Sequence, residues 1–294
     1  MKRKIVKQGA ATLMVSLPAK WAKRFALKKG DEVSLEEVND SLVLTSEAKE
    51  RALKVVMDVS NLYPLVKRFV FNKYVQGVDE IILTSKKPEL LADIPDVVKA
   101  GLVGFEVVEQ SKNKIVMKQV SHVSEEEFDV MLRRLFLLVK MMGSDLVSAL
   151  NNKEKNLSYV VRQDENVNRF SSFCMRTINK RVRNTIAENS ALYSIVFLIE
   201  NLGDCYKMLA KLKSNEKLTN LLADVNDFYS DYISLFYDFK VDSAVAFSLR
   251  HQKLKSLLEK TKVSSAEDAK FLGLLQQCLN YVILMLNNQM VYGV

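Results

Sequence analysis

Proline is confined to the first third of this chain. All four prolines precede residue 96, at Pro18, Pro64, Pro88 and Pro95, and none follows in a chain of 294 residues. Because proline breaks helix interiors, its absence favours long helices in the C-terminal part. From about residue 123, apolar residues recur at i, i+3, i+4 and i+7, and the breaks in this pattern predict six helices. These breaks lie near 151–156, 182–189, 213–216, 238–242 and 261–265.

Two helix starts also carry a recognisable signal. Ser124 precedes Glu127, and Ser264 precedes Glu267, with the spacing of a capping box. We expect a helix to begin at each of these serines.

Residues 53–120 follow a different pattern. Short runs rich in β-branched residues, such as LKVVMDV and EIILTS, alternate with helix-like stretches at about 62–76 and 88–100. This order predicts β-α-β-α-β-β. The segment has no Gly-rich phosphate loop, so we interpret it as a packing spacer between two functional ends.

The positive charge is concentrated at the N-terminus. Residues 1–30 contain nine Lys or Arg and no Asp or Glu, so the rest of the chain sums to −1 within a formal net charge of +8. A basic block indicates an anionic partner, either nucleic acid or a membrane surface, unless it is a solvated face balanced by another subunit. No run of about 18 apolar residues is present to span a bilayer. We therefore expect a cytoplasmic protein without membrane insertion.

Cysteine and histidine offer little chemistry. Cys174, Cys205 and Cys278 are odd in number and far apart in sequence, which indicates reduced, buried thiols. The two histidines, His122 and His251, are expected at the surface. Without a nucleophile and base constellation, we expect no enzyme activity.

The stretch around Pro18 predicts a small mixed unit. ATLMVSL alternates as a strand does, PAKWAKRFA fits a short helix, and DEVSLEEV with SLVLTS predicts a hairpin. Trp21 and Phe25 lie on one helical face, opposite Lys20, Lys23 and Arg24. So small a sheet buries too little surface to be stable alone, so we expect a second copy of the chain as partner.

This N-terminal pattern resembles a known DNA-binding module. The strand ending VSLP, the helix with Trp21, LKKGDEVSL and the closing SLVLTS are similar to the swapped-hairpin AbrB/SpoVT/MazE domain, especially the form fused to PhoU-type phosphate-uptake regulators in archaea. The resemblance implies a dimeric β-barrel made by two chains. It departs from the family at Ala10, since the DNA-binding form often has arginine after the hairpin glycine, so phosphate contacts are expected more than base contacts. The implied DNA-binding residues are Arg3, Lys4, Lys7, Lys23 and Arg24.

A second resemblance lies in the helical half. Glu200 and Asp204, in ALYSIVFLIENLGDCYKML, resemble the E-x-x-x-D signature of a PhoU three-helix bundle, and Asp164 matches the first position of its companion D-x-x-x-D pattern, with Asn168 in the second. Carboxylates at i and i+4 share a face and can share a hard cation. Asp164, Glu200 and Asp204 thus predict a divalent metal site for Mg, Mn or Fe. A salt bridge to a neighbouring Lys or Arg is the alternative.

The second set of three helices carries amides instead. Aligning IENLGDC with LQQCLNY places Gln276 opposite Glu200 and Asn280 opposite Asp204. Amides are poor charge-neutralising ligands, so we expect any metal in the first set of helices only.

These observations predict a multidomain α+β protein. We expect an AbrB-like swapped-hairpin domain over 1–48, a small α/β domain over 49–121 and a PhoU-like helical domain over 122–294, with three-helix repeats at about 122–212 and 213–294. The predicted function is a homodimeric, DNA-binding regulator of phosphate uptake. The alternative is an adaptor that does not bind DNA, dimerises through the barrel and docks on a phosphate-transporter ATPase or sensor kinase.

Overall fold

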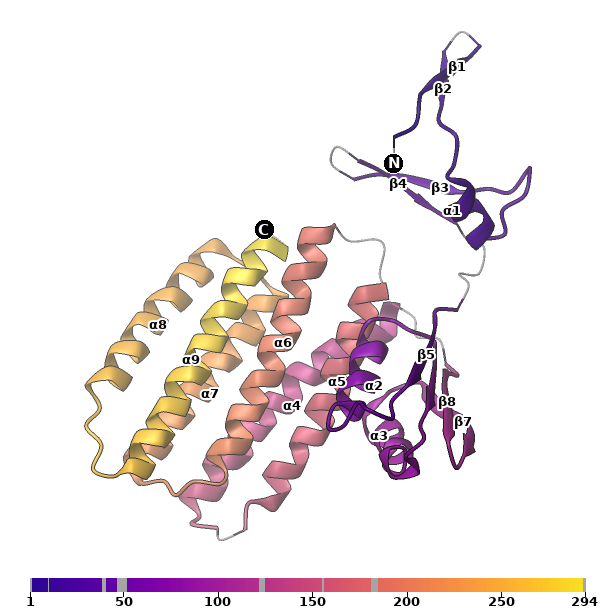
Figure 1. Ribbon diagram of the computed structural model, residues 1–294. Helices are drawn as coiled ribbons and strands as arrows, with labels where there is room; N and C mark the ends of the chain where they lie inside the picture. Colours follow the sequence, from indigo (N-terminus) through magenta and orange to yellow (C-terminus); the bar gives the residue numbers. More distant parts are fainter. Residues whose placement is uncertain are drawn as a thin grey trace. The chain divides into compact units, whose positions relative to one another are not determined.

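The computed structural model describes residues 2–9, 11–38, 41–46, 52–121, 125–154, 156–180 and 185–292. The chain divides into two compact units, residues 1–53 and 54–294 (Figure 1). Ala10, His122 and Ser124, on which three sequence expectations rest, lie outside the described residues.

The first unit consists of two hairpins and a short helix. Strand β1 (Val6–Gln8) pairs with β2 (Thr12–Met14), and β3 (Ser34–Val38) pairs with β4 (Ser41–Thr45), both antiparallel. Helix α1 (Ala19–Arg24) follows Pro18, which is its N-cap residue. The predicted strand, helix and hairpin are therefore confirmed. Within the described residues of this single chain, however, the strands form two separate two-stranded sheets and no closed barrel.

This unit buries very little apolar surface. Among the large apolar residues described in it, only Phe25 is buried, at 9% exposure. Leu13 in β2 and Leu42 in β4 are 68% and 69% exposed. The strand edges and the exposed side chains leave the described residues of this unit without a core of their own. The other exposed apolar residues are Ile5, Val6, Met14, Val15, Leu17 and Leu35.

The second unit begins with a four-stranded sheet. Its strands are β5 (Lys54–Asp58), β6 (Glu80–Thr84), β7 (Phe105–Ser111) and β8 (Lys114–Gln119), in the order β5-β6-β8-β7. Between them lie α2 (Val66–Val75), the 3₁₀ turn η1 (Pro88–Leu90) and α3 (Ile94–Gly101). Strands β5 and β6 are parallel, and β8 is antiparallel to both its neighbours. The predicted β-α-β-α-β-β order is confirmed.

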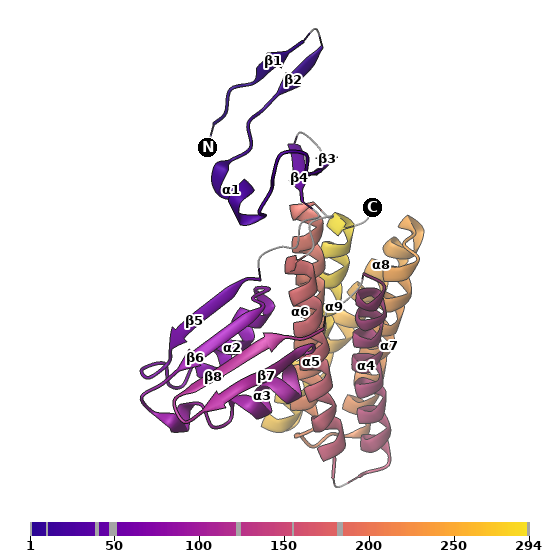
Figure 2. The same cartoon turned by 90° about the vertical axis from the view of Figure 1, so that its right-hand side faces the viewer.

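Helices α2 and α3 cover one face of this sheet (Figure 2). Side chains of alternate strand residues, including Ile81, Leu83 and Met117, pack with Val70 of α2 and Val98 of α3 into a small core. The period of two along each strand explains why every second residue reaches this core.

Six long helices complete the second unit. They are α4 (Glu125–Asn151), α5 (Ser158–Lys180), α6 (Ile186–Leu209), α7 (Glu216–Tyr237), α8 (Val241–Lys260) and α9 (Ala266–Tyr292). Each boundary lies at or beside a predicted break, so the six-helix prediction is confirmed.

These helices share one apolar core. Helices α4, α5 and α6 contact one another, as do α7, α8 and α9, while α6 packs along α9 and α4 along α7. Helix α9 is long and apolar enough, by length and composition, to cross a membrane, and it is the only such helix among the described residues. Half of its most apolar stretch of 18 residues is buried inside the protein, as in the core helix of a bundle.

The capping prediction for α9 was wrong by one residue. Ser265 Oγ accepts a hydrogen bond from the backbone N–H of Asp268 at 3.0 Å, while Glu267 accepts one from the backbone N–H of Lys213 at 2.8 Å. Helix α6 carries a reciprocal capping box that the sequence analysis missed, with Thr185 as N-cap and Glu188 at N3.

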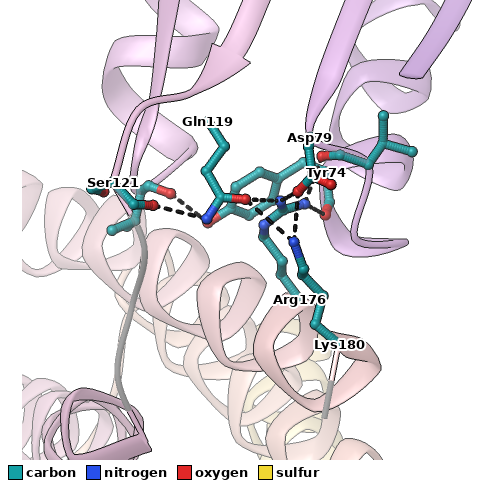
Figure 3. A network of polar contacts seen from close by, with 8 residues as sticks. Tyr74, Asp79, Gln119, Ser121, Arg176 and Lys180 are labelled. Carbon is teal, nitrogen blue, oxygen red and sulfur yellow. Dashed lines mark hydrogen bonds and ion pairs between the residues drawn. The ribbon is translucent and has the colours of Figure 1, made fainter. Parts of the chain in front are cut away.

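A buried arginine joins the sheet region to the bundle (Figure 3). Arg176 of α5 is 5% exposed. Its Nη1 donates to the carbonyl oxygens of Tyr74 and Val78 at 2.7 and 2.8 Å. Its Nη2 donates to Asp79 Oδ1 at 3.0 Å and to Gln119 Oε1 at 2.7 Å. The guanidinium group thereby satisfies acceptors from α2, from the loop before β6 and from β8 at once, as its planar fork allows.

Lys180 reinforces the same contact one turn later in α5. Its Nζ lies 2.6 Å from Asp79 Oδ1, and Gln119 Nε2 donates to the carbonyl oxygen of Ser121 at 2.8 Å (Figure 3). The guanidinium of Arg176 also lies over the Tyr74 ring, 4.9 Å from its centroid. The α/β segment and the helices thus form one compact unit held by buried polar contacts.

Candidate functional site

The short helix of the first unit presents an aromatic face and a cationic face. The rings of Trp21 and Phe25 lie 5.0 Å apart, with Phe25 buried and Trp21 half-buried. Lys20, Lys23 and Arg24 are exposed, and the guanidinium of Arg24 lies 4.7 Å from the Phe25 ring centroid. The predicted division into anchor and cations is confirmed by these exposures.

The loop after α1 continues the cationic surface. The backbone N–H of Lys28 donates to Asp31 Oδ2 at 2.7 Å, and Gly30 has φ of +96°, a conformation that favours glycine. This turn leaves Lys28 and Lys29 exposed. Gly30 and Asp31 thus form the turn between α1 and β3.

The remaining predicted DNA contacts precede and enter the first hairpin. Arg3 and Lys4 lie ahead of β1, and Lys7 lies within it, directly opposite Leu13 of β2; all three cations are exposed. Since neighbouring residues of a strand face opposite sides, Lys7 and Leu13 share one face, and Val6 shares the other with Met14. One face of this hairpin therefore carries both a cation and an apolar side chain, the other face carries apolar side chains, and all of these are exposed.

The helical half contains the predicted carboxylates around a lysine. Asp164 of α5 is buried, at 4% exposure, and its Oδ2 lies 2.7 Å from Lys207 Nζ. The same ammonium lies 3.1 Å from Asp204 Oδ1, and Asn168 Nδ2 donates to Asp164 Oδ2 at 3.0 Å. The structure therefore brings Asp164 and Asp204 to one cation, Lys207, which belongs to the chain itself.

Burial sets the ionisation of this cluster. Burial, together with the charges of Asp204 and Asp164, raises the pKa of Glu200 to about 7. Burial also raises the pKa of Asp164, and the hydrogen bond from Lys207 opposes that rise. Burial alone would lower the pKa of Lys207, but its hydrogen bonds to the two aspartates outweigh this effect and raise it. The cluster thus favours a charged lysine and a partly protonated Glu200 near neutral pH.

The geometry favours the salt bridge over the metal. Among the described residues, no group of three His, Cys, Asp or Glu side chains could hold a metal ion. Lys207 takes the position between Asp164 and Asp204 where a divalent cation would otherwise balance the charge. One carboxylate oxygen, Asp164 Oδ1, is buried without a hydrogen-bond partner. The three-carboxylate metal site stays a prediction, and the ion pairs with Lys207 account for the proximity of Asp164 and Asp204.

The second set of helices has a small hollow at the corresponding place. Gln276 and Asn280 of α9 line a cavity of about 170 Å³, together with Lys255 and Glu259 of α8. The two charged side chains lie 4.0 Å apart. Lys255 thus lines the same cavity as Gln276 and Asn280, which align with Glu200 and Asp204 of the first set.

Sequence reasoning missed the two most informative cations of the second unit. Lys207 lies three residues after Asp204, which is one helical turn and a signal for an ion pair. Arg176 is the only charged residue of the segment FCMRTI, and a lone charge in an apolar stretch of helix indicates a buried polar contact.

The cysteine prediction is confirmed, with one addition. Cys174, Cys205 and Cys278 are buried thiols that take part in no disulfide. A hydrogen bond with Cys278 lowers the pKa of Cys205, whereas burial raises the pKa of Cys278. The two thiols, 73 positions apart in the sequence, meet where α6 packs along α9.

Comparison with known proteins identifies the first unit only. Residues 6–52 match the family described as "Antidote-toxin recognition MazE, bacterial antitoxin". No curated protein matches the chain, and no solved structure does. The match includes α1, its cationic face and both hairpins, and it reaches none of the six long helices. Residues 6–52 are therefore a MazE/AbrB-like antitoxin-type domain, a kind of domain that typically dimerises and binds DNA.

Proposed function

We propose that this chain is a DNA-binding regulator that contacts DNA through a dimer of its N-terminal domain. One observation carries the proposal: residues 1–30 hold nine cations and no acid, on a unit whose apolar side chains are exposed. Pairing two copies would bury those apolar residues and double the positive charge on one small body. Such a body suits the phosphate backbone of DNA, which dominates the affinity of most DNA-binding proteins.

Lys23 and Arg24 are the proposed phosphate contacts that are simplest to test. Both are exposed on α1, and their reversal to Glu changes four sites in a dimer. We expect the logarithm of the binding constant to fall with the logarithm of salt concentration. In Lys23→Glu/Arg24→Glu this slope should be less negative by about 3.6, because four phosphate contacts are lost at about 0.9 each. Lys262→Glu/Lys270→Glu, two exposed lysines of the second unit, changes net charge equally and is the matched control. Equal loss of affinity in both variants would contradict the proposal.

The phosphate-uptake role is part of the proposal and rests on the PhoU-like pattern of Glu200, Asp204 and Asp164. Capture of genomic DNA by the protein, followed by sequencing, tests it. Enrichment upstream of phosphate-transport genes would support this role, and a uniform distribution of fragments would contradict it.

A non-catalytic adaptor is the second candidate, and helix α8 favours it. Val241, Val245 and Leu249 are exposed at intervals of four residues, so they form an apolar ridge on one side of this peripheral helix. A partner such as a transporter ATPase or a sensor kinase could pack on such a ridge. If Val245→Asp/Leu249→Asp abolishes the regulatory effect in cells and Lys23→Glu/Arg24→Glu does not, the adaptor function is correct and the DNA-binding function is wrong.

A further inference from the structure

The four-stranded sheet of the second unit has helices on one face only. Helices α2 and α3 lie behind the sheet in Figure 2, and no other described helix of this unit covers the face toward the viewer. Ile81 and Leu83 of β6 and Met117 of β8 belong to the core on the helical side. Because strand residues alternate, their neighbours Glu80, Ile82 and others face the opposite side.

The strand register arranges these outward residues in rows, and the first row consists of charges. Lys54 is opposite Glu80, Glu80 is opposite Lys118, and Lys118 is opposite Glu106. The sign therefore alternates across all four strands. Lys54 Nζ lies 3.0 Å from Glu80 Oε1, and Lys118 Nζ lies 3.5 Å from Glu80 Oε2.

The second row is mostly apolar. It contains Val56, Ile82 and Val116, followed by Glu109 on β7. Val56 is 63% exposed, whereas Val116 is buried although it belongs to neither apolar core. The third row returns to polar residues, with Asp58, Thr84, Lys114 and Ser111. The face thus has an apolar strip between two polar rows, and because Ile82 is half-buried and Val116 buried, Val56 provides most of the exposed surface of that strip.

An alternating row of four charges is complementary to itself when its order is reversed. A two-fold axis that runs parallel to the strands, between β6 and β8, reverses the order of the strands. Each row of one copy then faces the same row of the other copy. Lys54 then faces Glu106 of the second copy, and Glu80 faces its Lys118. In the apolar row, Ile82 faces Val116 of the second copy. No two like charges meet in any of the three rows.

We propose that this sheet face is a self-association surface, which packs on the same face of a second copy about a two-fold axis between β6 and β8. Sheets that pack face to face lie about 10 Å apart at about −30°, which four short strands can adopt. A two-fold contact uses one self-complementary patch on both copies, as these rows provide. The apolar strip is small, so the contact is weak and electrostatic pairing sets its orientation. The surface is independent of the DNA-binding domain.

Site-specific cross-linking of the full chain tests the contact. Thr84 lies on β6, beside the axis, so a Thr84→Cys chain and its copy should be joined by a short bismaleimide. Lys99→Cys, on the exposed side of α3, is the control because it lies on the helical side of the sheet. The three natural cysteines are buried and serve as a constant background. A yield at Thr84→Cys no higher than at Lys99→Cys would overturn the proposal.

Charge reversal then tests the pairing across the axis. Both reversals are made in the Thr84→Cys chain. Lys118→Glu makes Glu80 of each copy face an acid of the other copy, and Glu80→Lys makes Lys118 of each copy face a cation of the other copy. Each variant alone should lose cross-linking at least about tenfold. An equal mixture of the two variants should recover it, because Lys and Glu then face each other in the mixed pair.

The same charge-reversal test can be made with the residues of the two edge strands, β5 and β7. Lys54→Glu and Glu106→Lys should behave in the same way, which keeps the test valid if a change at half-buried Glu80 prevents folding. Loss without recovery in both mixtures, or no loss in either reversal, would overturn the two-fold contact. Neither result would affect the DNA-binding proposal, since every altered residue lies in the second unit.

Discussion

The two units of this chain differ in where they place their apolar residues. In the second unit, alternate strand residues and one side of each long helix enter two continuous cores. In the first unit, β2 and β4 carry the same kinds of residues, yet Leu13 and Leu42 remain exposed and Phe25 alone among its described large apolar residues is buried. Composition and local pattern are therefore not enough to make a unit self-sufficient. Two hairpins and a six-residue helix cannot enclose a core, whereas layers of helices and sheet can.

The same contrast applies to charge. The cations of α1 lie on the surface, while Arg176 and Asp164 of the second unit are nearly fully buried and bonded. Exposed charges contribute little to stability and are available to a ligand. Buried charges cost stability when a partner is removed. We therefore expect changes in the first unit to affect association and binding, and changes in the second to affect folding.

The largest effect is expected from placing charge on the exposed apolar residues of the first unit. Leu13→Asp/Leu42→Asp would bury four carboxylates in a dimer interface, which should raise the dissociation constant of the dimer at least about a hundredfold. Sedimentation velocity measures this change. The circular dichroism of the helices should stay the same, because neither residue belongs to the second unit.

Ile186→Asp is the control for this prediction. Ile186 is 88% exposed at the first turn of α6, and an acid is well placed there. It should leave the sedimentation of the dimer unchanged. A Leu13→Asp/Leu42→Asp protein that dimerises as tightly as the unaltered chain would show that these residues remain in water, and the contrast between the units would fail.

The next effect concerns the arginine of the second unit. Arg176→Met fills a similar volume but leaves the carbonyl oxygens of Tyr74 and Val78 without their donor. The free energy of unfolding should fall by roughly 3 kcal/mol, as expected when one partner of a buried charged network is removed. Urea unfolding followed by circular dichroism measures it. Arg169→Met, an exposed arginine of the same helix, should change it by less than about 0.5 kcal/mol.

Much of the fold of the second unit could be predicted from the sequence. The absence of proline after Pro95 and the helical periodicity predict six helices, and α4 to α9 confirm them, because helix formation is largely a local matter. How the two hairpins of the first unit pack could not be predicted from local patterns in this way. In the proposed dimer, whether the β1–β2 and β3–β4 hairpins pair with each other depends on a second chain, and that information is not local.

The candidate site was predicted less well than the fold. Asp164 and Asp204 were expected together, and the structure places both at Lys207, which the sequence analysis did not consider. The i and i+4 spacing of Glu200 and Asp204 places these two residues on one face of α6 but does not identify the element that packs against it. Arg176 was missed for the same reason, since its acceptors come from residues about 57 to 102 positions away in the chain.

The ion pair of Lys207 offers a smaller effect that separates the salt bridge from the metal. Lys207→Met removes the cation from buried Asp164, so we expect a loss of roughly 2 kcal/mol in unfolding free energy at pH 7, after allowance for the partial exposure of the lysine. Adding Asp164→Asn should recover most of this loss, since a neutral amide needs no counterion. Urea unfolding of the single and double variants measures the coupling.

Elemental analysis completes that test. If the lysine is the counterion, protein purified without chelator should hold no stoichiometric Mg, Mn or Fe. Its melting temperature should not rise when these metals are added. Bound metal that is lost in Glu200→Gln/Asp204→Asn would show that the carboxylates bind a divalent cation and that the ion-pair interpretation is wrong.

The smallest effect is a pH dependence at Glu200. Burial raises the pKa of this carboxyl to about 7 in the folded protein, above its ordinary value of 4.5. The folded state therefore binds more protons than the unfolded state between these two values, and the stability falls as the pH rises from about 4.5 to about 7. Glu200→Gln removes the titration, so it should raise the free energy of unfolding by roughly 1 kcal/mol at pH 8, after allowance for the partial exposure of the side chain, and change it little at pH 4.5. If Glu200→Gln lowers stability at pH 8 instead, the carboxylate is stabilised by a cation, and the burial of charge in the second unit is balanced at this residue as it is at Asp164.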